Sequence, residues 1–382
     1  MVRLRRLTAL AIAGVAVVGV LYLVDGRDDS KSTQHVENVS TTTTTGSEPA
    51  PPPPSNAPPS TADPSQTFTI SAVGDTMLGK NGNGPPDPST YLSEVADDLT
   101  RDAQIVFGNL EGTLSDVSGS KCGADSTNCF AFQVPPSYAT YLAEAGFDVL
   151  NTANNHSHDF GEAGLKQTVD AIRGAGMVDT GQRGQVTVVN AGSIRVAFVG
   201  FAPYRETSNL LDLDGARTLL RTARQQSDVV VAYMHAGAEG SDAQHVTGEA
   251  ESYVGEDRGN PRAFAHMAID EGASLVLASG PHVLRGMEFY KGHLIAHSLG
   301  NFAGYTNFNT SGILSNSAIL RVTLNGAGEF VGGQVVPVAL TSKNQPTNGG
   351  DAIGMMRRLS DADFGAAAPQ FASDGTIIPP TR

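Results

Sequence analysis

From Thr67 onward the sequence alternates short runs rich in β-branched residues with stretches whose apolar residues recur at helical spacing. The expected strands cover residues 67–73, 104–108, 148–152, 186–190, 194–201, 228–234 and 274–277. The expected helices cover residues 89–100, 137–145, 162–173, 211–227 and 261–271. Alternation of this kind is typical of βαβ units, in which helices cover a sheet. We therefore predict a fold of the α/β class.

The last third of the chain has a different pattern. After Pro281 the helical spacing largely stops, and residues 285–290, 293–298, 313–324 and 329–339 predict antiparallel strands joined by Gly-containing turns. The segment after Ser342 is polar, with one short helix expected near 352–359. We therefore expect one folded domain at 67–340 and a partly ordered C-terminal extension at 341–382.

The N-terminal part has the composition of a membrane anchor followed by a linker. Three arginines within residues 1–6 precede an apolar run at 7–24 that carries no charge, and no small-residue cleavage site follows it. We favour an uncleaved single-pass anchor in the cell membrane, with residues 1–6 in the cytoplasm and the C-terminal domain outside. A cleaved signal or a lipid-modified form is the alternative. Residues 25–66, rich in Thr, Ser and Pro, predict a disordered linker, either a plain spacer or a glycosylated stalk.

The cysteines and the net charge limit the chemistry further. Cys122 and Cys129 lie close together in a polar loop, and outside the cytoplasm such a pair favours a disulfide. They do not make a metal site by themselves, because no third Cys or nearby His completes one. The formal net charge of −14 argues against nucleic acid and anionic membrane surfaces as partners. Cationic and metal-bridged ligands stay compatible with it.

Polar residues that can bind a metal follow five of the expected strands. They are Asp75, Glu111, Asn155, His235 and His282. Because ligands of open α/β sheets bind beyond the carboxyl ends of the strands, we expect these side chains to form one site. Taken singly, each acid could be an ordinary turn or loop residue, so the prediction depends on the five occurring together. Carboxylate, amide and imidazole groups suit Mn, Zn, Fe or Mg rather than soft metals.

Several neighbouring residues are expected to have structural roles. Asp159, with Glu162 three residues later, resembles a capping box and is expected to cap the helix that follows. His158 is expected to be a surface or packing residue. Three histidines lack motif context and are expected to be structural: His245, His266 and His293. His297 ends an expected strand, and its role stays open.

The segments around the candidate residues resemble, in order, the motifs of the CapA family of capsule, or poly-γ-glutamate, synthesis proteins. The similar segments are Gly74–Leu78, Gly108–Glu111, Ala153–Gly161, His235–Glu239, Pro281–Val283 and Ser298–Phe302. This family is related to the calcineurin-like metallophosphatases. Over residues 68–302 the resemblance implies a four-layer α/β/β/α metallophosphatase-like sandwich.

The resemblance also implies a role for each residue. Asp75 would be shared between two ions, with Glu111 as a further ligand and His282 completing the first ion. Asn155 and His235 would bind the second ion. His156 would stand beside them as a catalytic proton donor or a stabiliser of negative charge. Five further site candidates lie in the same motifs or next to them: Asn109, Asn154, Asp159, Glu239 and Asn301.

Departures from the family pattern weaken the second ion. Gly280 stands where the family commonly has a His, which removes one imidazole. Met77 replaces a His of the metallophosphatases, as is usual in CapA-like chains, and Ala236 replaces a frequent Trp. His297 stands at a usual Tyr and is a candidate local replacement. We therefore expect one divalent ion at Asp75, Glu111 and His282, and only a weaker second position.

Two functions agree with these observations. The first is a cell-envelope protein for the synthesis or export of an anionic capsular polymer such as poly-γ-glutamate, with membrane polymer-synthase proteins as candidate partners. The second is a surface metal-dependent hydrolase of phosphoesters. An anchor and a linker would serve either function, and no nucleic-acid partner is expected.

Overall fold

The computed structural model describes residues 62–123 and 129–381. Within these residues a first sheet has the strand order β19 (Pro346–Asn348), β18 (Phe330–Leu340), β17 (Asn316–Asn325), β1 (Thr67–Thr76), β2 (Ile105–Leu110), β5 (Val149–Asn151) and β6 (Val178–Thr180). Strands β1, β2, β5 and β6 run parallel to one another, whereas β17, β18 and β19 each pair antiparallel with their neighbours. A short strand, β16 (Asn301–Ala303), pairs with the end of β1.

A second sheet has the order β14 (Met287–Tyr290), β15 (His293–Ala296), β13 (Leu275–Ser279), β10 (Val229–His235), β8 (Ile194–Ala202) and β7 (Thr187–Ala191), and β9 (Ser208–Asn209) pairs with β8. The four middle strands are parallel, and β14 and β7 close the two edges in antiparallel pairs. The strands after Pro281 that we expected to be antiparallel therefore divide between the two sheets.

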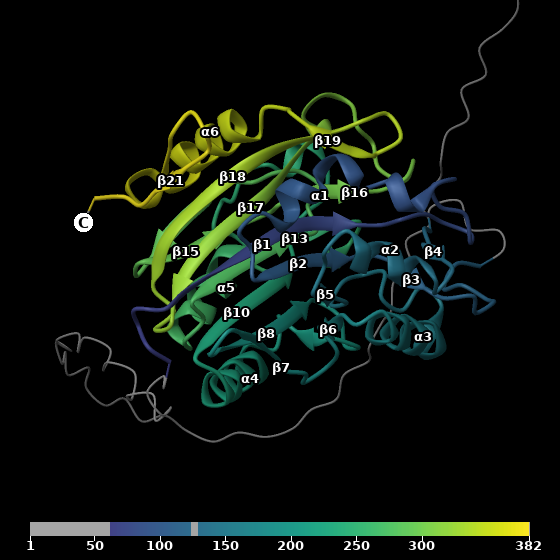
Figure 1. Ribbon diagram of the computed structural model, residues 1–382, viewed down its shortest axis with the longest axis horizontal. Coiled ribbons are helices and arrows are strands. Elements are labelled where there is room, and N and C mark those ends of the chain that lie inside the picture. The colour runs from purple at the N-terminus through teal and green to yellow at the C-terminus, as the bar shows by residue number, and fades with distance from the viewer. Residues whose placement is uncertain (1–61, 124–128, 382) are drawn as a thin grey trace, which may run out of the picture. The chain divides into compact units, whose positions relative to one another are not determined.

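The two sheets pack face to face, and helices cover their outer faces (Figure 1). Along β10, Val229, Val231 and Tyr233 point into the core between the sheets, whereas the residues between them face the helices. The Phe107 ring of β2 stacks on Phe198 of β8 at 5.5 Å across this core. Burial on both faces explains why these strands are almost continuously apolar in the sequence.

Five helices form the outer layers. The first sheet packs against α1 (Ser93–Thr100), α2 (Tyr138–Glu144) and α3 (Gly161–Gly174), and the second against α4 (Leu213–Gln226) and α5 (Pro261–Asp270). The four-layer α/β/β/α sandwich is thus confirmed. The predicted helix at 89–100 is divided into a 3-10 turn, η1 (Pro88–Thr90), and α1, and a further turn, η3 (Gly312–Ser315), precedes β17.

The C-terminal segment, expected to be a partly ordered extension, belongs to the same compact unit as the rest of the fold. Helix α6 (Ala352–Phe364) places Met355, Met356 and Leu359 in the core between the sheets. A hairpin of β20 (Gln370–Phe371) and β21 (Ile377–Ile378) adds two more apolar side chains to that core. The segment is polar overall, so its few apolar residues did not predict burial. They are buried because α6 packs against apolar side chains of β18 and β14.

The shortest elements had no periodicity from which to predict them. They are β3 (Thr113–Leu114), β4 (Gln133–Val134), β11 (Ser252–Tyr253), β12 (Glu256–Asp257), η2 (Ser241–Ala243) and η4 (Gly365–Ala367). Strands β11 and β12 form a hairpin that lies beside the site described below.

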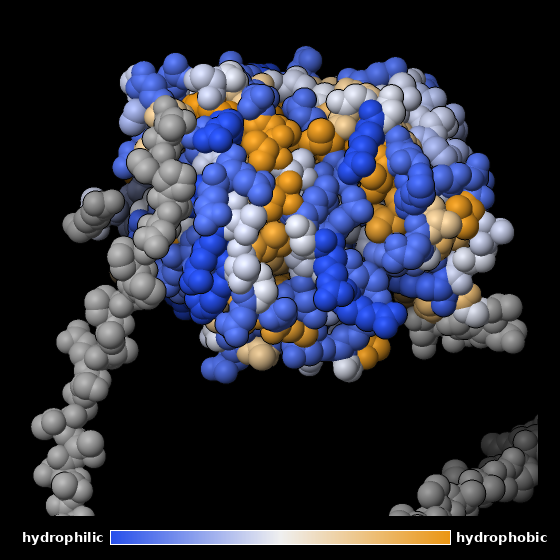
Figure 2. Space-filling model, turned by 90° about the horizontal axis from the view of Figure 1, so that it is seen from below, coloured by the Kyte–Doolittle hydropathy of each residue, from blue (hydrophilic) through white to orange (hydrophobic). Residues whose placement is uncertain are grey.

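The disulfide between Cys122 and Cys129 is present, as predicted. The cytoplasmic segment 1–6, the anchor 7–24 and nearly all of the linker 25–66 lie outside the described residues. Among helices within 62–123 and 129–381, none is long and apolar enough to cross a membrane. On the face shown in Figure 2 hydrophilic side chains predominate, with hydrophobic residues in small separate groups between them.

Candidate metal centre

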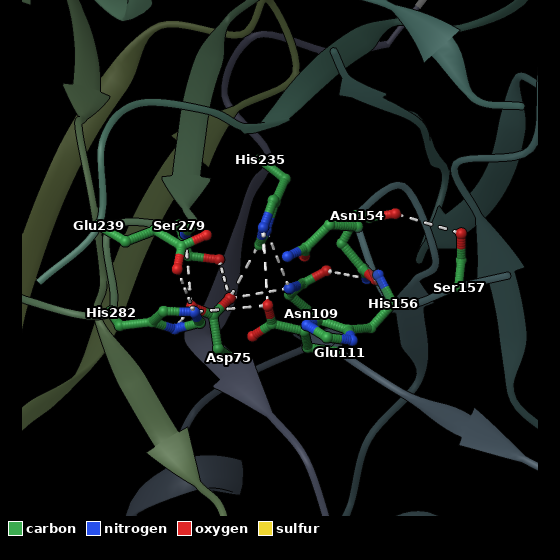
Figure 3. Close-up of polar contacts among 12 residues, drawn as sticks. Asp75, Asn109, Glu111, Asn154, His156, Ser157, His235, Glu239, Ser279 and His282 are labelled. Carbon is green, nitrogen blue, oxygen red and sulfur yellow. Dashed lines mark hydrogen bonds and ion pairs between the residues drawn. The ribbon is translucent and has the colours of Figure 1, made fainter. Parts of the chain in front are cut away.

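The carboxyl ends of parallel strands from both sheets meet at one place. Asp75, near the end of β1, lies beside Asn109 of β2 in the first sheet. His235 ends β10 and pairs with Ser279 at the end of β13 in the second sheet. Figure 3 shows their side chains converging with Glu111 and His282. The ends of four strands, β1, β2, β10 and β13, are thus the source of these side chains, at the edge where the sequence pattern placed the site.

Asp75 is fully buried and is held from four directions. Oδ1 accepts hydrogen bonds from Asn109 Nδ2 at 2.8 Å and from the Ser279 hydroxyl. Oδ2 accepts from the Gly280 amide at 3.3 Å and lies 3.1 Å from His282 Nδ1. Burial alone would raise the pKa of Asp75, but His282 and the other partners outweigh it and lower that pKa. Asp75 is therefore an anchored, ionised carboxylate.

Glu111 differs from Asp75, because neither of its oxygens has a hydrogen-bond partner among the described residues. The side chain is fully buried, and Oε1 lies 3.6 Å from Nε2 of both His235 and His282. Burial and the charge of Asp75 raise the pKa of Glu111 well above its usual range. A buried carboxyl group without partners is costly. A divalent cation between Glu111 and the imidazoles would supply the missing partner, so the residues fit a metal ion.

The His282 ring is held at Nδ1 by Asn301 and Asp75, and its Nε2 faces Glu111. Nδ1 lies 2.8 Å from Asn301 Oδ1, and Nε2 lies 3.6 Å from Glu111 Oε1. The backbone is left-handed, with φ of +58°, which is strained for a residue with a Cβ. Asn301 Nδ2 donates to the His282 carbonyl at 3.2 Å and holds this conformation. An imidazole fixed through its second nitrogen is the usual arrangement of a metal ligand.

The charge around His282 has a consequence for metal binding. Burial by itself would lower the pKa of His282, but Glu111 and Asp75 outweigh it and raise that pKa to about 10. A proton and a cation therefore compete for Nε2. Ligand atoms of Asp75, Glu111 and His282 all lie within 4.8 Å of one another. The structure brings together the three residues of the better-supported predicted position.

Residues of the weaker, second position also carry free ligand atoms. His235 is fully buried, and its Nε2 has no hydrogen-bond partner in the described part of the chain. The side-chain oxygen of Asn155, Oδ1, is also buried without a hydrogen-bond partner among the described residues. Burial lowers the pKa of His235 well below its ordinary value, so the imidazole is neutral, as a metal ligand must be. Lys121 places its ammonium 2.8 Å from the Asn155 carbonyl and brings positive charge to this side.

His156 forms a dyad with Asp159. The His156 Nδ1 lies 2.9 Å from Asp159 Oδ2, and Asp159 also accepts from Phe132 N at 2.6 Å and pairs with Lys121 Nζ at 2.7 Å. The prediction that Asp159 caps a helix is wrong. The N-cap of α3 is Phe160, which makes no side-chain capping bond. Local spacing suggested a cap, whereas partners distant in sequence claim the carboxylate.

A cleft of about 380 Å³ opens over these residues. Its polar lining includes His156, Glu239, His282 and Asn301. Its apolar lining includes Phe130, Phe132, Tyr253, Phe308 and Leu314. Phe130 is 63% exposed, which is unusual for a side chain of its size. The cleft therefore joins a charged floor to an aromatic rim.

Comparison with known proteins agrees with the geometry. The family model described as "Bacterial capsule synthesis protein PGA_cap" matches residues 69–306, more than half of the 382-residue chain. The chain belongs to this family. The predicted CapA resemblance is thereby confirmed.

Two relatives from Bacillus illustrate the family. The chain is 27% identical over 293 residues to the PGA biosynthesis protein CapA of Bacillus subtilis, covering 71% of each protein. It is 25% identical over 274 residues to the capsule biosynthesis protein CapA of Bacillus anthracis, covering 65% of this chain and 63% of the relative.

Similarity to solved structures is weaker. A 5'-nucleotidase precursor of Thermus thermophilus matches with a TM-score of 0.40 and 13% identity, over 78% of this chain and 59% of its own. A purple acid phosphatase of yellow lupin matches with a TM-score of 0.38 and 12% identity, over 76% of this chain and 54% of its own.

Positions where this PGA_cap chain departs from the family pattern can now be located. Gly280 has φ of +115°, and a Cβ there would lie 3.1 Å from Ala236 N. Position 280 therefore offers only its amide, which donates to Asp75. His297 does not replace the missing imidazole. Its Nε2 lies 3.0 Å from Glu288 Oε1, and its ring stacks on Phe364.

The remaining site candidates of this PGA_cap chain support the ligands. Asn109 Oδ1 accepts from Asn154 Nδ2 at 3.0 Å and from Asn151 Nδ2 at 2.7 Å, and this network fixes the amide that donates to Asp75. Four participants were not predicted from the sequence: Asn151, Ser279, Lys121 and Arg258. Asn151 could have been found, because it is a lone amide within an otherwise apolar strand. The others carry no local pattern.

Proposed function

We propose that this protein is a cell-envelope component of the synthesis or export of an anionic capsular polymer such as poly-γ-glutamate, and that it binds the polymer at a metal-dependent cleft. Membership in the capsule synthesis family supports the process. The observation that carries the metal dependence is Glu111, buried without a hydrogen-bond partner among the described residues and placed between two imidazoles. One divalent ion is the expected cofactor, and a second is the weaker part of the proposal.

Charge explains why a polyanion would need a cation at this cleft. Glu239 lines the cleft, the buried carboxyl groups of Asp75 and Glu111 lie behind His282, and the chain as a whole has a formal net charge of −14. An anionic chain would be repelled from such a surface in the absence of cations. When bound, a divalent ion supplies positive charge that attracts carboxylate or phosphate oxygens and polarises them. The aromatic rim would contact the apolar parts of the polymer between its charges.

The proposed place of action is the outer side of the cell membrane. Residues 7–24 would anchor the chain, residues 25–66 would act as a linker, and membrane polymer-synthase proteins would be partners. The disulfide between Cys122 and Cys129 supports this placement, because disulfides persist mainly in oxidising compartments.

A second candidate function, a metal-dependent phosphoesterase, is favoured by the His156–Asp159 dyad. His156 lines the cleft and is held through Nδ1, which leaves Nε2 for a ligand. Burial lowers the pKa of His156, although Asp159 opposes this effect. Asp159 favours the protonated form of His156, and in that form the imidazolium could donate its Nε2 proton to a leaving oxygen, the role of a general acid.

One set of measurements on the full-length protein in detergent separates the two functions. Metal content, binding of poly-γ-glutamate with and without chelator, and hydrolysis of a generic phosphodiester are measured for the wild type, His156→Ala and the surface control His158→Ala. Chelator-sensitive polymer binding without hydrolysis supports the assembly role. Metal-dependent turnover that disappears in His156→Ala alone supports the phosphoesterase. Absence of bound metal in a metal-supplemented wild type would sink both.

A further inference from the structure

We infer that Glu239 is a fourth ligand of the ion at Asp75, Glu111 and His282, and that this chain therefore builds a carboxylate-rich centre for a hard divalent cation such as Mn²⁺. The inference deepens the proposed function and rests on it, because it requires the metal centre. Glu239 follows β10, four residues beyond His235, and its side chain is 14% exposed.

The two oxygens of Glu239 have different partners. Oε1 lies 2.9 Å from Arg258 Nη1. Oε2 is turned the other way and lies 3.7 Å from His282 Nε2 (Figure 3). One oxygen is thus fixed by a cation of the protein, while the other faces the imidazole nitrogen that Asn301 leaves free.

Distances around His282 Nε2 suit a shared ion. This nitrogen lies 3.6 Å from Glu111 Oε1 and 3.7 Å from Glu239 Oε2. Two ligand atoms bound about 2.1 Å from one ion are roughly 3–3.5 Å apart. The two separations from His282 Nε2 therefore need to contract only slightly. Glu239 lies outside the group of Asp75, Glu111 and His282 whose ligand atoms are all within 4.8 Å of one another, so its side chain must shift toward the ion when the ion binds. The fully buried, unpartnered oxygens of Glu111 are an independent indication that a cation belongs here.

Arg258 has the position of an outer partner. Its side chain is 1% exposed, and Nη1 also lies 3.1 Å from the Tyr204 hydroxyl oxygen. The backbone around it is fixed, because Arg258 N donates to Glu251 O at 2.9 Å and Gly237 N donates to Arg258 O at 3.1 Å. Ligating carboxylates are commonly oriented by such a hydrogen bond to their second oxygen.

A plain ion pair between Glu239 and Arg258 is the competing assignment. That pair accounts for Oε1, but it does not account for the direction of Oε2, because His282 already has Asp75 and Glu111 as charge partners. Position 280 offers no side chain to this side of the centre. With Glu239 the ligand set becomes three carboxylates and one imidazole, which suits a hard cation.

The test is isothermal titration of the full-length protein with Mn²⁺, with Glu239→Gln as the variant and Glu256→Gln as the matched control. Both acids contact Arg258 Nη1, but Glu256 lies 3.6 Å away, is 56% exposed and accepts from the Tyr204 hydroxyl. We expect Glu239→Gln to weaken Mn²⁺ binding at least tenfold. Substituting a residue that only orients a ligand already lowers metal affinity by about 10–100-fold, and loss of a ligand itself should cost no less. The control should change affinity by less than about threefold, because exposed ion pairs contribute little.

Near-UV circular dichroism establishes that each variant is folded, and Glu239→Asp replaces Glu239→Gln if the latter is not. The shorter acid keeps the charge but withdraws the oxygen from His282, so it too should bind Mn²⁺ more weakly. Affinity equal to that of the wild type would overturn the role of Glu239 and leave the metal centre intact. Failure of the wild type itself to bind Mn²⁺ would overturn the centre, and with it the proposed function.

Discussion

The Ser279 hydroxyl, at the end of β13, donates a hydrogen bond to Asp75 Oδ1, at the end of β1, and so joins the two sheets directly under the metal centre. The Tyr233 hydroxyl contacts the same Ser279 oxygen from the core side. All three side chains are buried. The bond therefore makes the relative position of the sheets part of the site geometry.

Removal of this hydrogen bond should destabilise the fold. Ser279→Ala takes a partner from the ionised Asp75, and hydrogen bonds to charged groups contribute about 1.5–3 kcal/mol. We expect the free energy of unfolding, measured by urea denaturation, to fall by about 2 kcal/mol. Ser317 is an apt control, because its buried hydroxyl has no hydrogen-bond partner among the described residues, so Ser317→Ala should cost far less. Equal losses in the two variants would contradict the assigned role.

Asp159 should matter more than a helix cap does. Its carboxylate is fully buried and is shared by His156, Lys121 and the Phe132 amide. Breaking a buried charged network by removing one member costs about 3–5 kcal/mol, whereas losing a cap costs about 1 kcal/mol. We expect Asp159→Asn to lose about 3 kcal/mol in thermal or urea unfolding. Asp212→Ala, which removes the cap that accepts from Gly215 N, is the comparison and should lose about 1 kcal/mol.

Glu111 should lower the stability of the metal-free protein while being required for Mn²⁺ binding. In chelator, Glu111→Gln removes an acid whose ionised form is disfavoured by burial and by the charge of Asp75, so unfolding should become harder by about 1 kcal/mol. The same change should abolish the stabilisation by added Mn²⁺, which reaches about 2.7 kcal/mol at about 100 times the dissociation constant. Thermal denaturation with and without Mn²⁺ measures both effects. Mn²⁺ stabilisation that survives in the variant would show that Glu111 is not a ligand.

A second acid cluster predicts sensitivity to low pH. Glu288 Oε1 lies 2.9 Å from His266 Nε2 and 3.0 Å from His297 Nε2, and Oε2 lies 3.1 Å from Arg262 Nη2. Burial by itself would raise the pKa of Glu288, but the hydrogen bonds with the two histidines outweigh it and hold that pKa well below its usual range. The pKa of a Glu in the unfolded chain is about 4.3. Because the pKa of Glu288 is lower than this in the folded protein, its ionised form stabilises the fold above that pH, and the stabilisation is lost as the pH falls toward the folded pKa.

The corresponding variant is Glu288→Gln. It should lose about 3–5 kcal/mol at neutral pH, because it removes the buried carboxylate from its ion pair with Arg262 and from its hydrogen bonds with the two histidines. The difference in free energy of unfolding between the variant and the wild type should decrease as the pH falls below about 4.5. Urea denaturation at a series of pH values measures it, and Glu162→Gln, an 86% exposed acid, should change little throughout. A difference that is constant with pH would mean that Glu288 carries no lowered pKa.

Residues with a strong local pattern were predicted well. The core strands were recognisable because burial on both faces makes them continuously apolar, as in β10 and β13. Asp75, Glu111, His235 and His282 were recognisable because parallel strands present their carboxyl ends together. Predictions failed where a local pattern had a distant competitor. Asp159 had the spacing of a cap, but its carboxylate contacts the Phe132 amide and Lys121, which lie far from it in the chain. The helix predicted near 352–359 is present, but its polar sequence did not indicate that it packs into the core.

The alternation of strands and helices, the family, the disulfide and the residues that gather at the strand ends could all be predicted from the sequence alone. These predictions rest on the spacing and the order of residues along the chain, which can be read directly from the sequence. Which atoms face one another is a property of the folded chain: Asp75 is anchored by Ser279, Glu111 has no hydrogen-bond partner in the described residues, and Glu239 turns one oxygen to Arg258 and the other to His282. Such relationships depend on the packing of one sheet against the other, and no local pattern encodes the distance between residues that lie far apart in the chain.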